Sequence, residues 1–372
     1  MNILHIAAFE GNIGDNASHL GFLNILDGLM PSYEIHRLEI RKAYKNYTGK
    51  DKLRFDDEFV KLANSYDLVV FGGGGFLDYW VEGSNNGTTI DISQEVFEKI
   101  NTEVVITSVG SNPHREVPKE NYKKFELFLK YVRSKSNITI ALRNDGSINS
   151  IRNDFGESAL EGLVEILDHG YFYKPTGNYV LPIDEPYVAI NVTDDQLNMR
   201  GGINEDRDWY YNELKIVIEN VTKRGYKIVF VPHIHQDVEA IGSVLNKLPS
   251  GLARASTIVA PCIQSDSGTD LIFNTYKNAK LVIASRYHAN VCSIKLGVPT
   301  IGLSPLDRIK YTHNQMTLNQ TAFSHSVSVG FSDAIVSNIN DIENGNYEFN
   351  LKQLDELKNK TISFYKKLFN IK

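Results

Sequence analysis

The chain has 372 residues, of which 42% are hydrophobic and 23% charged, and its formal net charge is −6. Such a length favours two domains of ordinary soluble composition, and the negative charge argues against bulk binding of nucleic acid. No apolar run approaches the roughly 20 residues that span a bilayer, and the two cysteines suggest no disulfide framework. The first residues lack the pattern of a signal peptide, so we expect a cytoplasmic protein with free thiols.

Buried strands and helices alternate along the first half of the chain. Apolar, β-branched runs predict strands at 2–8, 34–40, 67–72, 103–110 and 138–143. Helical periodicity lies between them, for example at 15–29 and 121–134. Continuous apolar strands that alternate with helices indicate a parallel sheet covered on both faces, which is the α/β class.

The second half repeats this rhythm after an irregular segment. Strands are predicted at 187–192, 226–232, 257–261, 280–285 and 299–304, with helices at 207–224, 236–247, 269–279, 287–297 and 332–342. The segment 168–186 is rich in Pro, Gly and Tyr and predicts the linker. We therefore expect two Rossmann-like, doubly wound domains, residues 1–175 and 176–345, which face a cleft at the carboxyl ends of their strands.

Residues 346–372 predict a C-terminal helical segment. One face carries Leu351, Leu354, Thr361, Tyr365 and Leu368, with lysines around it. A helix docked on the protein is the simpler interpretation. The alternative is a lysine-rich surface in peripheral contact with the inner face of the membrane.

Two glycine-rich turns follow predicted strands. In FEGNIGDNAS (9–18), free backbone N–H groups suit an anion or a sugar hydroxyl, and the alternative is a plain turn capped by Asp15. The turn lacks the third glycine of a dinucleotide fingerprint. The four glycines 72–75 in FGGGGFLD allow a ligand or another backbone to approach, but no P-loop Lys-Ser/Thr follows.

Two further strand ends carry polar residues. Arg143 and Ser147 lie in ALRNDGS (141–147), where Arg143 either binds an anion or pairs with a nearby carboxylate. His233 lies in FVPHIHQD (230–237), at the edge of the predicted cleft or in a solvated loop. No HExxH or CxxC accompanies it, so we expect no metal site.

The stretch SRYHAN (285–290) joins a buried strand to a helix. Arg286 is permanently charged and binds a carboxylate or phosphate in a bidentate manner. His288 stands near the positive end of the helix, where a bound anion would hold it protonated for use as a general acid. The alternative is a buried Arg–carboxylate pair beside a hydrogen-bonded core histidine.

Together these motifs resemble the polysaccharide pyruvyl transferase family. The resemblance rests on NIGD, FGGGGFLD, the Arg-x-x-x-Ser of RNDGS, the PH…D of VPHIHQD, and SRYHA followed by GVPTIGLSPLDRIK, in order over residues 9–310. Asn144 departs from the usual Arg-Asp of the family. The polar region 193–206 matches no family motif and is predicted to be a mobile acceptor loop.

The resemblance implies a GT-B-like fold, with an acceptor-side N-terminal domain, a donor-side C-terminal domain and a last helix that crosses back to the N-terminal domain. It also implies a transferase that moves pyruvate from phosphoenolpyruvate onto a sugar of a cell-surface polysaccharide or its precursor. The product would be a ketal, phosphate would be released, and no cofactor would be needed beyond phosphoenolpyruvate as co-substrate. The acceptor would be a glycan or a lipid-linked or nucleotide-linked sugar.

The resemblance to this family also suggests catalytic and binding roles for the polar residues. The catalytic candidates are His288 and Asp15; donor binding is expected of Arg286, Arg143, Ser147 and Tyr287; acceptor binding is expected of Asn12, Asn16, Gly73, Gly74 and His233. The identity of the general base is left open. The rival hypotheses are a nucleotide-sugar-dependent glycosyltransferase on the same fold and a non-catalytic glycan-binding protein.

Overall fold

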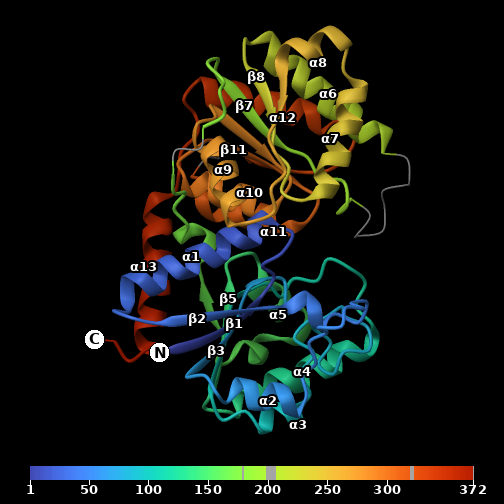
Figure 1. Ribbon diagram of the computed structural model, residues 1–372. Coiled ribbons are helices and arrows are strands. Elements are labelled where there is room, and N and C mark those ends of the chain that lie inside the picture. Colours follow the sequence, from blue (N-terminus) through green and yellow to red (C-terminus); the bar gives the residue numbers. More distant parts are fainter. Residues whose placement is uncertain (178–179, 198–206, 319–321, 372) are drawn as a thin grey trace. The chain divides into compact units, whose positions relative to one another are not determined.

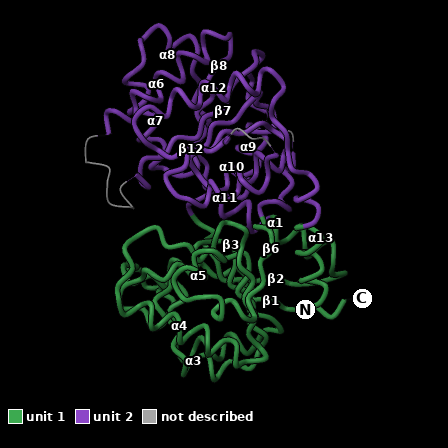
Figure 2. The backbone as a smooth tube through the Cα atoms, turned by 180° about the vertical axis from the view of Figure 1, so that it is seen from behind, with its two compact units in different colours: residues 1–10, 21–169, 357–372 green, residues 11–20, 170–356 purple. Residues whose placement is uncertain are grey.

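The computed structural model describes residues 1–177, 180–197, 207–318 and 322–371. Residues 198–206, most of the predicted acceptor loop, lie outside the described residues. The chain divides into two compact units (Figure 2). Unit 1 comprises residues 1–10, 21–169 and 357–372, and unit 2 comprises residues 11–20 and 170–356.

This division differs from the predicted domain boundaries in three places. The chain passes from unit 1 to unit 2 after His169, a few residues before the boundary expected at 175. The predicted C-terminal segment 346–372 is divided, because residues 346–356 belong to unit 2 and residues 357–372 join unit 1. Residues 11–20 join unit 2, where the N–H of Ile13 donates to the carbonyl of His233 at 3.4 Å and its carbonyl accepts from the Thr269 hydroxyl at 3.4 Å.

Unit 1 is built on a parallel sheet of six described strands in the order β2-β1-β3-β4-β5-β6 (Figure 1). The strands are β1 (Asn2–Ala7), β2 (Glu34–Glu39), β3 (Leu68–Gly74), β4 (Glu103–Val109), β5 (Ile138–Arg143) and β6 (Val164–Ile166). The helices wholly within it are α2 (Asp57–Ala63), α3 (Gln94–Glu98), α4 (Lys119–Arg133) and α5 (Ser147–Phe155). Phe71 and Ile106 of the strands and Phe125 of α4 belong to one buried core.

Unit 2 has a second parallel sheet, whose described strands follow the order β12-β11-β10-β7-β8-β9. The strands are β7 (Tyr187–Asn191), β8 (Lys227–Phe230), β9 (Thr257–Val259), β10 (Leu281–Ala284), β11 (Thr300–Ser304) and β12 (Ser324–Ser326). The helices are α6 (Asp208–Lys223), α7 (His235–Lys247), α8 (Ser250–Ser256), α9 (Asp266–Lys277), α10 (Tyr287–Lys295), α11 (Asp307–Met316) and α12 (Phe331–Glu343). The direction of crossover reverses between β7 and β10, which is where this architecture places ligands.

Two α-helices among the described residues belong partly to each unit. In α1 (Ile13–Leu29) the division falls after Leu20, and in α13 (Leu351–Leu368) it falls after Glu356. Within unit 1, α13 binds through polar side chains: the Thr361 hydroxyl accepts the N–H of Leu167 at 2.9 Å, and the Tyr365 hydroxyl bonds His169 at 2.6 Å. The predicted return of the C-terminal helix to the N-terminal domain is therefore confirmed.

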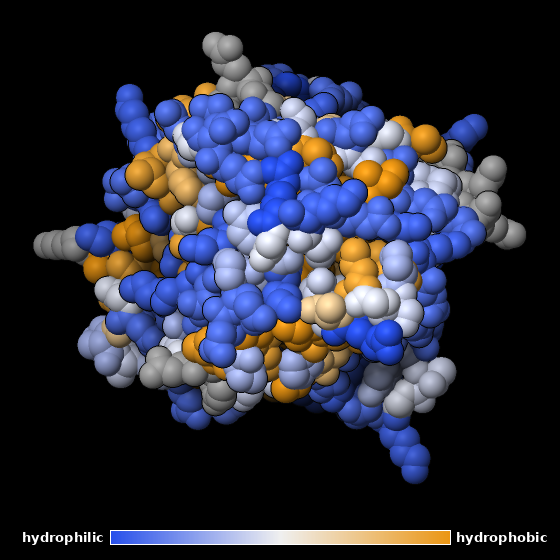
Figure 3. Space-filling model, turned by 90° about the horizontal axis from the view of Figure 1, so that it is seen from above, coloured by the Kyte–Doolittle hydropathy of each residue, from blue (hydrophilic) through white to orange (hydrophobic). Residues whose placement is uncertain are grey.

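No helix among the described residues is long and apolar enough to cross a membrane. The face of the molecule in Figure 3 is covered mainly by hydrophilic residues, with hydrophobic ones in small groups. Peripheral membrane contact stays a prediction.

Candidate active site

Arg286 and His288 lie at the carboxyl end of β10, beside the crossover reversal of the unit 2 sheet. The strand stops at Ala284, and Arg286 precedes the first residue of α10 with extended backbone angles. The Arg286 N–H donates to the Asn191 side-chain oxygen at 2.8 Å, so the end of neighbouring β7 fixes this turn. The sequence therefore predicted the position of both residues correctly, because a buried strand that meets a helix exposes its junction at the sheet edge.

The Arg286 side chain is 6% exposed and binds two carboxylates. Its Nη2 lies 2.5 Å from Asp237 Oδ1 and 3.1 Å from Asp195 Oδ1. Burial alone would lower the pKa of Arg286, but the charges of Asp237 and Asp195 raise it above its usual value. The guanidinium is therefore a fixed cation that already has internal partners, as in the alternative left open by the sequence.

His288 packs against the first turn of α1, within unit 2. Its Nδ1 lies 3.7 Å from Asp15 Oδ1, and its ring meets the ring of Tyr287 edge-on at 5.1 Å. A Cβ placed on Gly14 would come within 2.8 Å of His288 Cβ and 2.9 Å of Nδ1. Only glycine at position 14 leaves room for the histidine there, so the NIGD turn and the RYH motif form one structural unit.

The other polar residues of this turn have local partners. Asn12 Oδ1 accepts the N–H of Gly14 at 2.9 Å, so Asn12 caps the helix, and not Asp15 as in the alternative considered above. The helix begins at Ile13, two residues earlier than expected. Asn16 is 2% exposed and donates to Asp266 at 2.9 Å. Asn12 and Asp15 are thus the half-buried members of this turn, and Asn16 is engaged inside the fold.

His233 lies in the core and does not reach a surface. It is 1% exposed, and its Nε2 pairs with the Tyr276 hydroxyl at 2.8 Å. Burial, with the charges of Arg286 and His288, holds the pKa of His233 well below its usual range. The predicted contact of His233 with the acceptor does not fit this position. Its backbone N–H instead donates to Asp237 Oδ2 at 2.9 Å and helps to hold the partner of Arg286.

Arg143 and Ser147 form a separate buried cluster in unit 1, at the carboxyl end of β5. Arg143 Nε donates to Asp145 at 2.7 Å, and its Nη1 lies 3.6 Å from Asp168. The Ser147 hydroxyl donates to Asp145 and accepts the N–H of Ser111 at 2.7 Å. Arg143 is 2% exposed and Ser147 fully buried, so donor binding by either would require these bonds to be replaced.

The glycines at 73 and 74 have structural reasons of their own. Gly73 has a φ of +75°, which favours glycine, and a Cβ on Gly74 would come within 2.7 Å of the Phe76 ring. The backbone angle of Gly73 and the close approach of Phe76 to Gly74 explain why glycine occupies both positions, without a ligand. Acceptor binding at this turn stays a prediction.

Several polar residues near the site residues were not predicted to have a functional role. Asp237 occurs in the quoted PH…D motif and Asp195 in a stretch that matched nothing, and their pairing with Arg286 joins segments 49 and 91 residues apart. In unit 1, buried Asp78 binds His114 Nδ1 at 3.0 Å and accepts the N–H of Asn112 at 2.7 Å. Asp78 is the last residue of the quoted FGGGGFLD motif, whereas the only sequence signal for His114 was its place after a predicted strand.

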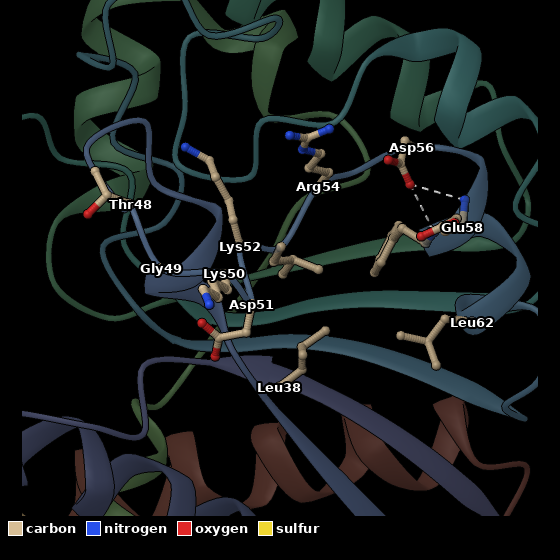
Figure 4. A pocket seen from close by; sticks show the side chains of 12 residues that line it. Leu38, Thr48, Gly49, Lys50, Asp51, Lys52, Arg54, Asp56, Glu58 and Leu62 are labelled. Carbon is tan, nitrogen blue, oxygen red and sulfur yellow. Dashed lines mark hydrogen bonds between the residues drawn. The ribbon is translucent and has the colours of Figure 1, made fainter.

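A pocket of about 850 Å³ opens elsewhere on unit 1, beside edge strand β2 and the start of α2 (Figure 4). Its lining includes three cationic and three anionic side chains: Lys50, Lys52, Arg54, Asp51, Asp56 and Glu58. Asp56 caps α2 by accepting the N–H groups of Glu58 and Phe59. None of the predicted site residues lines this pocket, and its charges balance, so we assign it no part in the chemistry.

No group of three or more His, Cys, Asp or Glu side chains among the described residues is placed to hold a metal ion. The cations and carboxylates are instead arranged as ion pairs, above all around Arg286 and Arg143.

Two Rossmann-like parallel sheets, with an arginine and a histidine at the crossover reversal of the second, define a two-domain α/β protein of the GT-B-like fold. The family model of polysaccharide pyruvyl transferase matches residues 12–307, which include most of the first glycine-rich turn, all of the second and the RYH motif. The chain therefore belongs to the polysaccharide pyruvyl transferase family, as the motifs predicted. Membership indicates an enzyme that transfers pyruvyl groups to polysaccharide.

Solved structures support the fold. The UDP-GlcNAc 2-epimerase of Methanocaldococcus jannaschii is similar with a TM-score of 0.54 and 13% identity, over 94% of this chain and 95% of that chain. The UDP-GlcNAc 2-epimerase of Neisseria meningitidis bound to UDP-GlcNAc is similar with a TM-score of 0.54 and 10% identity, over 100% of both chains. At such identities the likeness concerns the fold alone. No curated protein was found to match the sequence.

Proposed function

We propose that the protein transfers pyruvate from phosphoenolpyruvate to a sugar of a cell-surface polysaccharide or its precursor, as a ketal, and releases phosphate. The observation that carries the proposal is the pairing of a fixed cation, Arg286, with a titratable ring, His288, at the start of one buried helix in a chain of this family. Phosphoenolpyruvate bears a carboxylate and a phosphate, and a guanidinium matches either in a bidentate manner.

The reaction adds one proton to carbon and removes one from each of two hydroxyls, and the residues near α10 suit the first of these transfers. The methylene carbon of phosphoenolpyruvate takes up one proton and becomes the methyl group, while a sugar hydroxyl adds to the neighbouring carbon. The carbon–oxygen bond to phosphate then breaks and a second hydroxyl of the sugar closes the ketal. Of the two hydroxyl protons released, one balances the proton gained by carbon and the other leaves on phosphate or with solvent.

In this proposal Arg286 binds the donor anion and His288 delivers the proton. Asp15, whose Oδ1 lies 3.7 Å from His288 Nδ1, stabilises the protonated ring, and the N-terminus of α10 stabilises an anion bound beside it. Asn12, half-buried in the same turn, is the candidate partner of a sugar hydroxyl. Arg143 and Ser147 in unit 1 remain predicted donor contacts, and Tyr287 holds the ring of His288 through its edge contact.

The test incubates the protein with phosphoenolpyruvate and a panel of nucleotide-linked and lipid-linked sugars, and measures phosphate release. Acceptor-dependent release is the expected result. In His288→Ala, turnover falls by about a hundredfold or more while phosphoenolpyruvate still binds, because Arg286 is unchanged. Release of UDP from a UDP-sugar, with no phosphate from phosphoenolpyruvate, would mean that the protein is a glycosyltransferase instead.

A further inference from the structure

Both hydrogen-bonding edges of the Arg286 guanidinium are occupied by carboxylates of the chain itself. Asp237 binds the edge formed by Nε and Nη2, at 3.1 Å and 2.5 Å from its Oδ1. Asp195 binds the edge formed by Nη1 and Nη2, with contacts of 3.2 Å to Oδ2 and 3.1 Å to Oδ1. An external carboxylate or phosphate that binds Arg286 in a bidentate manner must therefore replace one of the two.

The two carboxylates differ in how firmly they are held. Asp237 has no exposed side-chain surface, and its Oδ2 also accepts the N–H of His233 at 2.9 Å and lies 3.4 Å from the Asn191 amide. The Asp195 side chain is 31% exposed, and apart from Arg286 it accepts from the hydroxyl of Thr193. Asp195 on the outer edge of the guanidinium, formed by Nη1 and Nη2, is therefore the more exposed and less firmly held of the two carboxylates.

The balance of charge makes the same distinction. One guanidinium faces two carboxylates, so the group as a whole is negative and repels an anion while Asp195 stays in place. Departure of Asp195 into solvent costs it little, since its side chain is already partly hydrated, whereas departure of Asp237 would leave a buried cation without a partner.

We infer that Asp195 is an internal competitor of the donor anion. Its carboxylate occupies the position on the outer edge of Arg286 that the ligand's carboxylate or phosphate takes, and Asp195 is displaced when the ligand binds. Asp195 thereby lowers the affinity of the site for oxyanions in general and favours ligands that can bind both nitrogens of that edge at once. The identity of the ligand as phosphoenolpyruvate rests on the proposed function, but the exchange of one oxyanion for another does not.

Asp195→Asn tests this inference because it removes the charge and keeps the shape. A hydrogen bond between two charged groups is stronger than one with a neutral partner by roughly 1 kcal/mol, and 1.4 kcal/mol corresponds to tenfold in affinity. We expect Asp195→Asn to bind anions about fivefold more tightly than the wild type. The measurement is titration calorimetry of the full chain, with inorganic phosphate alone and with phosphoenolpyruvate alone.

The neighbouring aspartate supplies a matched control. Asp194 pairs with Arg207 at 2.6 Å and accepts from the Tyr211 hydroxyl at 2.6 Å. Asp194→Asn removes the same charge one residue away, so we expect its anion affinity to stay within about twofold of the wild type, since partly exposed charges are well screened. Arg286→Gln should lose the binding that Asp195→Asn strengthens, which locates the anion at Arg286.

Three results would overturn the inference: anion affinity in Asp195→Asn equal to or weaker than that of the wild type, an equal gain in Asp194→Asn, or unchanged binding in Arg286→Gln. The binding experiment and the turnover of phosphoenolpyruvate can also succeed or fail independently of each other. Tighter binding of phosphate with no turnover of phosphoenolpyruvate would uphold the competitor and reject the pyruvyl donor. Turnover of phosphoenolpyruvate with an unaltered Asp195→Asn would do the reverse.

Discussion

Substitution of Gly14 tests whether the reaction depends on the position of the His288 side chain. A Cβ at position 14 would lie 2.8 Å from His288 Cβ and 2.9 Å from Nδ1. Carbon atoms in contact are normally about 3.5–4.0 Å apart, so Gly14→Ala must push the histidine away by roughly 0.7 Å or more. A displacement of about 1 Å at a reacting group can cost about a hundredfold in rate. We therefore expect the turnover number of Gly14→Ala to fall by between about tenfold and a hundredfold.

The free energy of unfolding should change less than the rate. Overpacking costs about 1–3 kcal/mol, and the higher helix propensity of alanine offsets about 1 kcal/mol of that. Gly28, near the end of the same helix α1, has nothing within 4 Å of its position for a Cβ, so Gly28→Ala gains the propensity without the clash. Urea denaturation and steady-state phosphate release, measured on both variants, separate the two effects. Wild-type turnover in a folded Gly14→Ala would refute the claim that the position of His288 matters to the reaction.

The buried ionisable groups Asp237 and His169 lead to two further predictions. Asp237→Asn leaves Arg286 buried with a weakened partner and should lower the free energy of unfolding by about 3–5 kcal/mol in urea denaturation, and a loss below about 1 kcal/mol would contradict the buried pair. Burial lowers the pKa of His169 from 6.5 to about 4, so the unfolded chain binds a proton that the folded chain does not between pH 6.5 and 4, and stability falls as the pH falls through this window. At about 1.4 kcal/mol per pKa unit the loss is about 3 kcal/mol, and His169→Gln should be free of it; an equal slope of stability against pH in both proteins would rule His169 out.

The hydrophobic pattern of the sequence predicted the central strands of both sheets. The predicted strands 280–285 and 103–110, for example, are continuous apolar runs between helices, and both are buried strands of parallel sheets in the structure. The short edge strands β6 and β12 were missed because each has only three residues and no run of its own. A strand end also predicts a position near the sheet edge, and Arg286 occupies one.

The partners of the site residues were not predictable in the same way. Asp195 and Asp237 reach Arg286 only because β7, β8 and β10 are neighbours in the folded sheet. The residues near Arg286 in the sequence do not indicate that these two aspartates are its partners. His233 was expected at the surface, but its strand end turns inward toward Tyr276. The need for glycine at position 14 likewise follows from a contact with His288, 274 residues away in the sequence. Sequence periodicity predicts which face of an element is buried, whereas these contacts depend on the order of the strands.

The central claim is that His288 protonates the methylene carbon of phosphoenolpyruvate while a sugar takes up the pyruvyl group. The most direct measurement is an NMR spectrum of the product made in deuterated water from phosphoenolpyruvate and an accepted sugar. We expect a ketal whose methyl group carries one deuteron from solvent, with phosphate formed in equal amount, and both products formed at least about a hundredfold more slowly by His288→Ala. A methyl group without deuterium, or a glycoside with release of a nucleotide in place of a ketal, would contradict it.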